Sequence, residues 1–205
     1  MKNTTLTTLF LFLVTISCKS QSIRNLEMEE YNFESGYYYK DINNKLTPFV
    51  GVWRYTNGNT LLEIHIQKKE NYFFNSLNYS TDILLGEVKY IENGIVKIDR
   101  VQNLNINNFS GSVHENFSIV GKFIIPNTNS PYCVECSPFY KRIDINFHDF
   151  LEPTLFFNCF IGLTDEPGNN QLVFNIHKAT SMIPSDGLPH DQTIPSGKYI
   201  LTKIP

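Results

Sequence analysis

Cys133 and Cys136 are three positions apart, a spacing found in redox-active pairs, half zinc sites and small disulfide rings. A redox pair needs a helix directly after it, because the helix N-terminus lowers the thiol pKa. Here Pro131 and Pro138 flank the pair, and an alternating strand pattern follows. A zinc site needs further ligands, and the sequence has no second cysteine pair and no closely spaced histidine pair. We expect a loop disulfide, with metal binding and redox catalysis as the alternatives.

The other titratable residues do not form a recognisable catalytic motif. The five histidines are His65, His114, His148, His177 and His190. Pairing of predicted strands could bring His65, His148 and His177 together, but we interpret them as surface side chains. Asp144, Asp149 and Glu152 are interpreted as solvated carboxylates rather than an acid–base pair. The patterns of serine hydrolases, zinc proteases and nucleotide-binding loops are missing from the sequence. We therefore predict no enzyme activity, no metal and no cofactor.

A free thiol and a tryptophan motif complete the candidates. Cys159 lies in a stretch that is apolar on both faces, which predicts a buried thiol that packs as a small hydrophobe. Gly51-Val52-Trp53 opens the first predicted strand and resembles the opening motif of lipocalins and fatty-acid-binding proteins. That resemblance implies a tryptophan that plugs one barrel end beside a basic residue of the last strand, here Lys198 or Lys203. The alternative is a core tryptophan of an unrelated β domain.

The N-terminus has the features of an export signal. Residues 1–17 contain Lys2 and a short apolar stretch over 9–16. That stretch is too short to span about 30 Å of hydrocarbon but fits a cleaved signal peptide. A serine directly before Cys18 is typical of lipoprotein cleavage sites, although Thr15 stands where Leu or Val is usual. We expect lipidation at Cys18; an ordinary secretory signal with an incidental cysteine is the alternative.

The predicted export signal also indicates how the chain is divided. The predicted divisions are a signal peptide over 1–17, a lipidated cysteine and tether over 18–37, and one β domain over 38–205. The tether is inferred because residues 19–36 are polar and lack clear periodicity. The acyl chains would hold the protein on a membrane of the cell envelope, which we expect to be the outer membrane, on its periplasmic or surface side.

Composition favours a β fold. The 205 residues are 41% hydrophobic and 14% aromatic, with Ala179 as the single alanine. Because alanine favours helices while β-branched and aromatic residues favour strands, we expect an all-β domain. The aromatic content argues against disorder, and the formal net charge of -3 argues against a nucleic-acid partner.

Alternating apolar and polar residues then locate the strands. The predicted strands cover about 50–56, 60–67, 82–91, 95–101, 116–125, 140–148, 154–162, 171–178 and 197–204. Asn57-Gly58 and Asn93-Gly94 mark tight hairpin turns. Residues 102–112 and 180–196 are predicted to be long loops. Successive hairpins favour an antiparallel meander that forms a lipocalin-like barrel or half-open barrel, with a sandwich as the alternative.

Several stretches together resemble an uncharacterised family of Bacteroidota envelope lipoproteins, classed as a domain of unknown function. The similar stretches are residues 39–46, 49–60, 85–94 and 133–138, with Lys141-Arg142. The resemblance covers about 38–153, and its most specific part is Trp-Arg-Tyr-Thr-Asn-Gly-Asn. It implies a lipoprotein in which the cysteine pair is a shared feature, but it implies no activity.

The sequence thus leaves three functional interpretations. The leading one is a non-enzymatic binding module for an apolar small molecule or an envelope component, which requires an open void of at least roughly 300 Å³. The second is a structural or protein-interaction lipoprotein with a packed core and an exposed patch, for which Tyr37–Tyr39 are candidates. The third is an envelope hydrolase, which requires convergent histidines or carboxylates.

Overall fold

A computed structural model gives the conformation of most of the chain. It describes residues 21–28, 32–105, 111–126, 132–138, 142–153, 155–164, 171–177, 180–181 and 191–205. The predicted signal peptide, Cys18 and His190 lie outside the described residues, so lipidation at Cys18 stays a prediction. No described helix is long and apolar enough to cross a bilayer.

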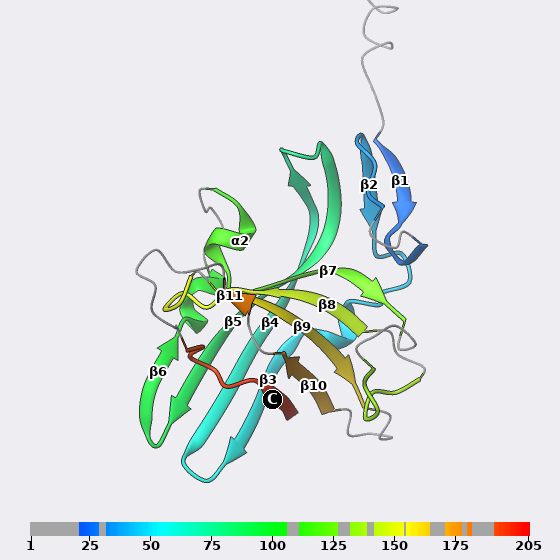
Figure 1. Cartoon of the computed structure of the whole chain (residues 1–205). Helices are drawn as coiled ribbons and strands as arrows, with labels where there is room; N and C mark the ends of the chain where they lie inside the picture. Colours follow the sequence, from blue (N-terminus) through cyan, green and yellow to red (C-terminus); the bar gives the residue numbers. More distant parts are fainter. Residues whose placement is uncertain are drawn as a thin grey trace, which may run out of the picture.

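Eight antiparallel strands form a closed barrel that follows chain order (Figure 1). They are β3 (Gly51–Asn57), β4 (Thr60–Phe74), β5 (Tyr79–Glu92), β7 (Ile119–Ile125), β8 (Arg142–Phe147), β9 (Leu155–Leu163), β10 (Gln171–Ile176) and β12 (Gly197–Ile204). Pairing of β12 with β3 and of β5 with β7 closes the ring. This confirms the lipocalin-like barrel over the sandwich. Asn93 and Gly94 have φ angles of 52° and 78°, as a tight hairpin turn requires.

One core fills the middle of the barrel. Each barrel strand contributes buried apolar side chains to it, among them Trp53, Ile64, Val88, Ile119, Ile145, Ile161, Phe174 and Leu201. Cys159 belongs to this core and is a buried free thiol, and burial raises its pKa. Packing of this kind supplies most of the stability of a single domain.

Further strands extend the sheet outside the ring. These are β1 (Ser22–Asn25), β2 (Tyr37–Lys40), β6 (Ile95–Asp99) and β11 (Thr180–Ser181). β1 pairs in parallel with β2, and β2 pairs in parallel with the start of β5. β6 pairs with the end of β5, and β11 pairs with the start of β9. The short helices are η1 (Leu26–Met28), η2 (Thr47–Phe49), η3 (Val101–Asn105) and α2 (Val113–Asn116).

The prediction of a tether over 18–37 is wrong for much of its described part. β1 lies within that range, Leu26 is buried, and Phe33 stacks on Tyr39 with ring centroids 4.4 Å apart. Tyr39 is fully buried, so an exposed patch over Tyr37–Tyr39 is also wrong. A short strand held by backbone hydrogen bonds needs no apolar alternation, and its sequence therefore resembles a polar linker.

β4 and β5 are longer than predicted. Their hairpin continues to Phe74 and Tyr79, past a β-bulge between Lys69 and Tyr72. Asn71 adopts a φ of 51° in the bulge and donates its backbone N–H to the buried carboxylate of Asp82. Figure 1 shows this hairpin rising between α2 on one side and β1 and β2 on the other.

A buried polar cluster fixes the base of this hairpin. Asp82 also accepts hydrogen bonds from the Tyr38 hydroxyl at 2.5 Å and the Asp41 N–H at 3.0 Å. Asp41 accepts from the backbone N–H groups of Lys45 and Leu46, and Lys68 Nζ lies 3.1 Å from its carboxylate. Each buried carboxylate therefore has hydrogen-bond donors, as burial of charge requires. Burial and the Asp82 carboxylate raise the pKa of Tyr38.

Candidate functional site

The barrel has one closed end, where β3 begins and β12 ends. Trp53 is buried there, and its Nε1–H donates a 2.8 Å hydrogen bond to the Phe49 carbonyl. Lys203 pairs with Trp53 in register, and its Nζ lies 5.2 Å from the ring centroid. This is the cation–π contact that the Gly-x-Trp resemblance implied. Lys198, the other lysine considered, contacts Glu135 instead.

Gly51 makes room for that contact. Its φ of 136° lies in the region that favours glycine, and a Cβ atom there would lie 2.6 Å from Lys203 Cε. The lysine stem therefore crosses the glycine before its ammonium reaches Trp53. Gly51, Trp53 and Lys203 therefore pack as one unit, which we call the plug.

A cleft of about 380 Å³ opens at the other end of the barrel, beneath α2. Its floor is formed by buried apolar side chains of the barrel core: Phe117, Phe147, Leu155 and Phe157. Its rim is mostly polar: Ser112, His114, Glu115, Asn146, His148 and Pro153. An apolar floor with a few polar groups above it is the usual construction of a small-molecule site.

The four-residue helix α2 positions half of this rim. The Ser112 side chain accepts the His114 N–H, and the Glu115 side chain accepts the Ser112 N–H, which makes a capping box. His114 Nδ1 lies 3.5 Å from the Asn146 amide nitrogen on β8. Ser-x-x-Glu is a recognised helix-start signal, and at residues 112–115 it could have located this helix from the sequence.

Both histidines of the rim are shifted toward the neutral form. Burial lowers the pKa of His114, and the nearby Lys122 charge lowers it further. Burial also lowers the pKa of His148, and the Arg100 charge acts in the same direction. At neutral pH each ring therefore offers one hydrogen-bond donor and one acceptor without a net charge.

His148 also lines a second, smaller cleft of about 210 Å³ next to β6. Arg100 lies in this cleft, with its guanidinium carbon 3.3 Å from the Phe150 ring centroid. The guanidinium also donates hydrogen bonds to the fully buried Glu87 carboxylate and to the Asn116 carbonyl. Burial raises the pKa of Glu87, whereas the hydrogen bond from Ser118 and the charge of Arg100 act to lower it. These bonds give the arginine a structural role between β5 and α2.

The other two described histidines, His65 and His177, do not join the cleft. His65 faces outward on β4 with Nε2 2.6 Å from Glu63 Oε1, beside a separate groove of about 320 Å³ under η3. His177 follows β10, with its ring 6.2 Å from that of Phe160. His65, His148 and His177, which strand pairing could have brought together, therefore lie in three separate parts of the structure.

The interpretation of Asp149 as a solvated carboxylate is wrong. Its side chain is buried, and it accepts hydrogen bonds from the backbone N–H groups of Leu151 and Thr193 and from the Thr193 hydroxyl. It ties the loop after β8 to the segment that leads into β12, next to the cleft. This role depends on a partner 44 residues away, which local sequence does not reveal.

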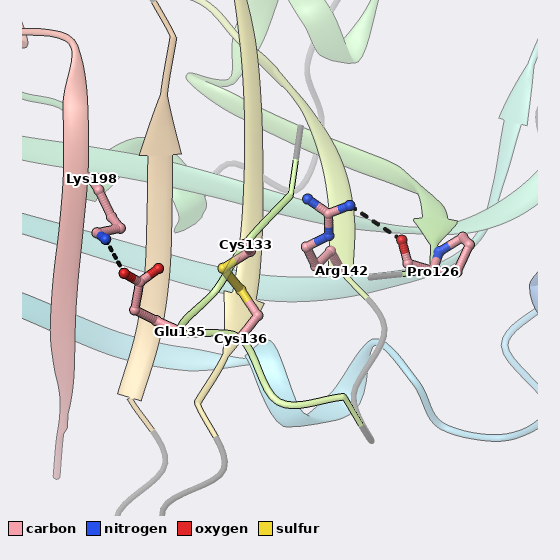
Figure 2. Close-up of a disulfide and its surroundings, with 6 residues drawn as sticks. All are labelled: Pro126, Cys133, Glu135, Cys136, Arg142 and Lys198. Carbon is pink, nitrogen blue, oxygen red and sulfur yellow. Dashed lines mark hydrogen bonds and ion pairs between the residues drawn. A yellow bond between two sulfur atoms is a disulfide. The ribbon is translucent and has the colours of Figure 1, made fainter. Parts of the chain in front are cut away.

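The disulfide prediction is confirmed: Cys133 and Cys136 are bonded (Figure 2). The disulfide packs in a small buried cluster with Phe160 and Val173, outside the barrel. A Cβ atom at Gly162 would lie 2.3 Å from Cys136 Sγ, so only glycine fits beneath it. Figure 2 shows Glu135 reaching from this loop to Lys198 on the last strand.

Across the described ranges, no group of three or more His, Cys, Asp or Glu side chains could hold a metal ion. No curated protein and no solved structure matches the chain. A protein family described as "Family of unknown function (DUF6705)" matches residues 1–204. Because this match covers nearly the whole chain, the protein belongs to that family of unknown function.

Proposed function

We propose that this protein is a non-enzymatic envelope lipoprotein that binds a small apolar molecule in the cleft beneath α2. The cleft itself carries the proposal, because its volume of about 380 Å³ falls within the range of small-molecule sites. The middle of the barrel is packed, so the ligand would occupy the open end of the barrel rather than its centre. Burial of apolar ligand surface at about 25 cal/mol per Å² would supply the affinity.

The rim limits the chemistry of that ligand. Its histidines are shifted toward neutrality, and Asn146 adds an uncharged amide. Glu115 places a carboxylate at the edge, which disfavours an anion. The best fit is a compact apolar molecule with one uncharged hydrogen-bonding group.

Binding without catalysis is proposed because the hydroxyl and carboxylate of the rim already have structural partners. Ser112 and Glu115 form the capping box of α2. Activation of a serine nucleophile requires a neighbouring base that is free to take its proton. The Ser112 hydroxyl, which would be the nucleophile, and the neighbouring Glu115 carboxylate instead hold the start of the helix.

An envelope location is supported by two separate features. The first 17 residues and Cys18 have the pattern of a lipoprotein signal. The Cys133–Cys136 disulfide fits an oxidising compartment, because reducing systems keep most cytosolic thiols free. We place the chain in the envelope, anchored by lipid at Cys18, on the outer membrane.

Titration with N-phenyl-1-naphthylamine, an uncharged apolar fluorophore, tests the cleft. Leu155→Trp should weaken binding at least about tenfold, because the larger ring fills the floor. Leu151→Trp is the matched control, since Leu151 is exposed and lies outside this cleft. Circular dichroism would establish that both variants are folded. Equal binding by the two variants, or no binding by the wild type, would contradict the proposed site.

A further inference from the structure

We propose that a sheet face beside the N-terminus rests on the membrane surface. Strand registers align Ile23 of β1 with Tyr38 of β2, Tyr38 with Ser80 of β5, and Ser80 with Phe73 of β4. Directly opposed residues project from the same side of a sheet, so these four share one face. Leu77 lies in the turn that joins β4 to β5. We call Ile23, Tyr38, Phe73 and Leu77 the extension face.

The two sides of this sheet differ sharply. On the opposite side, Tyr39 and Tyr79 are buried against Phe33, and buried Phe74 contacts Tyr79 in the same cluster of rings. On the extension face, Ile23, Phe73 and Leu77 are 58%, 46% and 54% exposed. Ile23 and Phe73 lie at the two ends of the row, and Leu77 lies in the adjoining turn. Three large apolar side chains left in water in this part of the sheet mark a surface with a partner.

The length of chain between Cys18 and β1 argues that the partner is a bilayer. Only three residues separate Cys18 from Ser22, so four Cα steps span at most about 14 Å. This step rests on the proposed lipid at Cys18. Because acyl chains on that residue lie in the hydrocarbon, Ile23 would be held within reach of the membrane interface. The domain could not stand away from the membrane as a long tether would allow.

The size of the face fits a lipid surface, and its exposed charges include both signs, Lys40 and Glu70. Four adjacent strands at about 4.8 Å spacing make the row from Ile23 to Phe73 roughly 14 Å wide. Lys40 pairs with Asn25 on this same side and is exposed, where it can contact anionic headgroups. Arg24, on the other side, is bonded to Glu34.

The arrangement also keeps the ligand cleft clear of the bilayer. Phe74 projects from the side opposite Phe73, and its ring lies 6.4 Å from His114 on the cleft rim. Figure 1 shows the hairpin of β4 and β5 between α2 on one side and the strands β1 and β2 on the other. A membrane contact at Phe73 and Leu77 would leave the cleft open to solvent.

Spin labelling of the full, processed chain on vesicles of phosphatidylethanolamine and phosphatidylglycerol tests this face. Nitroxides would be placed at Ser76→Cys in the hairpin turn and at Asn57→Cys, an exposed control position at the end of β3. The native thiol Cys159 is buried and would not compete for the label. At Ser76, the ratio of oxygen to nickel-chelate collisions should rise several-fold on vesicles, while at Asn57 it should stay unchanged.

Charge variants make the test specific. Phe73→Glu with Leu77→Glu should abolish the rise at Ser76, whereas Val134→Glu should leave it intact. Val134 is 91% exposed on the distant disulfide loop, so it controls for the loss of a surface apolar residue. All of these positions are exposed, and the substitutions remove no core packing.

Mass spectrometry of the same preparation separates the possible failures. An unmodified Cys18 would overturn the lipid anchor and the membrane face with it. A lipidated Cys18 with a water-exposed label at Ser76 would overturn the face alone. Dipolar coupling between labels on two copies would also overturn it, by assigning the face to self-association.

Discussion

At one end of the barrel, Trp53 fills the interior, Gly51 lets the Lys203 stem cross it, and the lysine ammonium covers the ring. At the other end, Phe117 and Phe157 also belong to the core, but beneath α2 they leave about 380 Å³ open. Both ends are built from aromatic side chains. The Trp53 ring is hydrogen-bonded to the Phe49 carbonyl and covered by Lys203. The Phe117 and Phe157 rings instead form the floor of a cleft.

Truncation of an aromatic residue at each end should show this difference most strongly. Trp53→Ala should reduce the free energy of unfolding by about 3–5 kcal/mol, because the enclosed site cannot collapse around the void. Phe157→Ala should cost about 1–2 kcal/mol less, because it enlarges a cleft that already exists. Denaturant unfolding followed by circular dichroism measures both, and a larger cost for Phe157→Ala would reverse the comparison.

Loss of the disulfide should have the next largest effect. Cys133→Ser with Cys136→Ser should lower the unfolding free energy by about 2 kcal/mol, since the ring it closes is short. The loop is also held by the Ser137 N–H, which donates to the Leu163 carbonyl, so the barrel should remain folded. Equal free energies of unfolding for the disulfide-bonded wild type and the double variant would refute this expectation.

The charge on the plug should contribute less. Lys203→Met keeps most of the stem over Gly51 but removes the ammonium, and should cost about 0.5–1 kcal/mol. Lys198→Met is the control, because that lysine pairs with Glu135 on the surface rather than with a ring. If both substitutions lowered the free energy of unfolding equally, the Lys203 contact with Trp53 would add nothing beyond an ordinary surface charge.

The smallest effect should come from acid at the open end. Burial lowers the folded-state pKa of His114 and His148, so the unfolded chain binds protons more readily. Stability should therefore fall as the pH drops below about 6.5, the usual histidine pKa. His148→Gln should flatten this slope below about pH 6.5. A slope that is the same in the variant would remove His148 from the explanation.

The sequence predicted the barrel well because one buried face imposes alternation on each barrel strand. Leu62, Ile64 and Ile66, for example, all enter the core of the structure. β1 was missed because it is a short strand with much of its surface exposed. The extension of β4 was hidden by the bulge at Asn71 and the charged residues before it.

The cleft could not be predicted in the same way. The plug has a local motif in Gly51 and Trp53, and one partner on the last strand. The cleft depends on where α2 lies relative to Phe147 and Phe157, and no short sequence pattern encodes that relation. Only the capping signal at Ser112 and Glu115 was available, and it locates the helix but not its neighbours.

The alternation of β9 has a consequence for oxidative folding. Cys159 points into the barrel, while Phe160 and Gly162, on the other side of the strand, lie against the disulfide. Once β9 has joined the sheet, the strand itself separates the free thiol from Cys133 and Cys136. A wrong disulfide with Cys159 can form only before that moment, so early pairing of β8, β9 and β10 would protect the correct one.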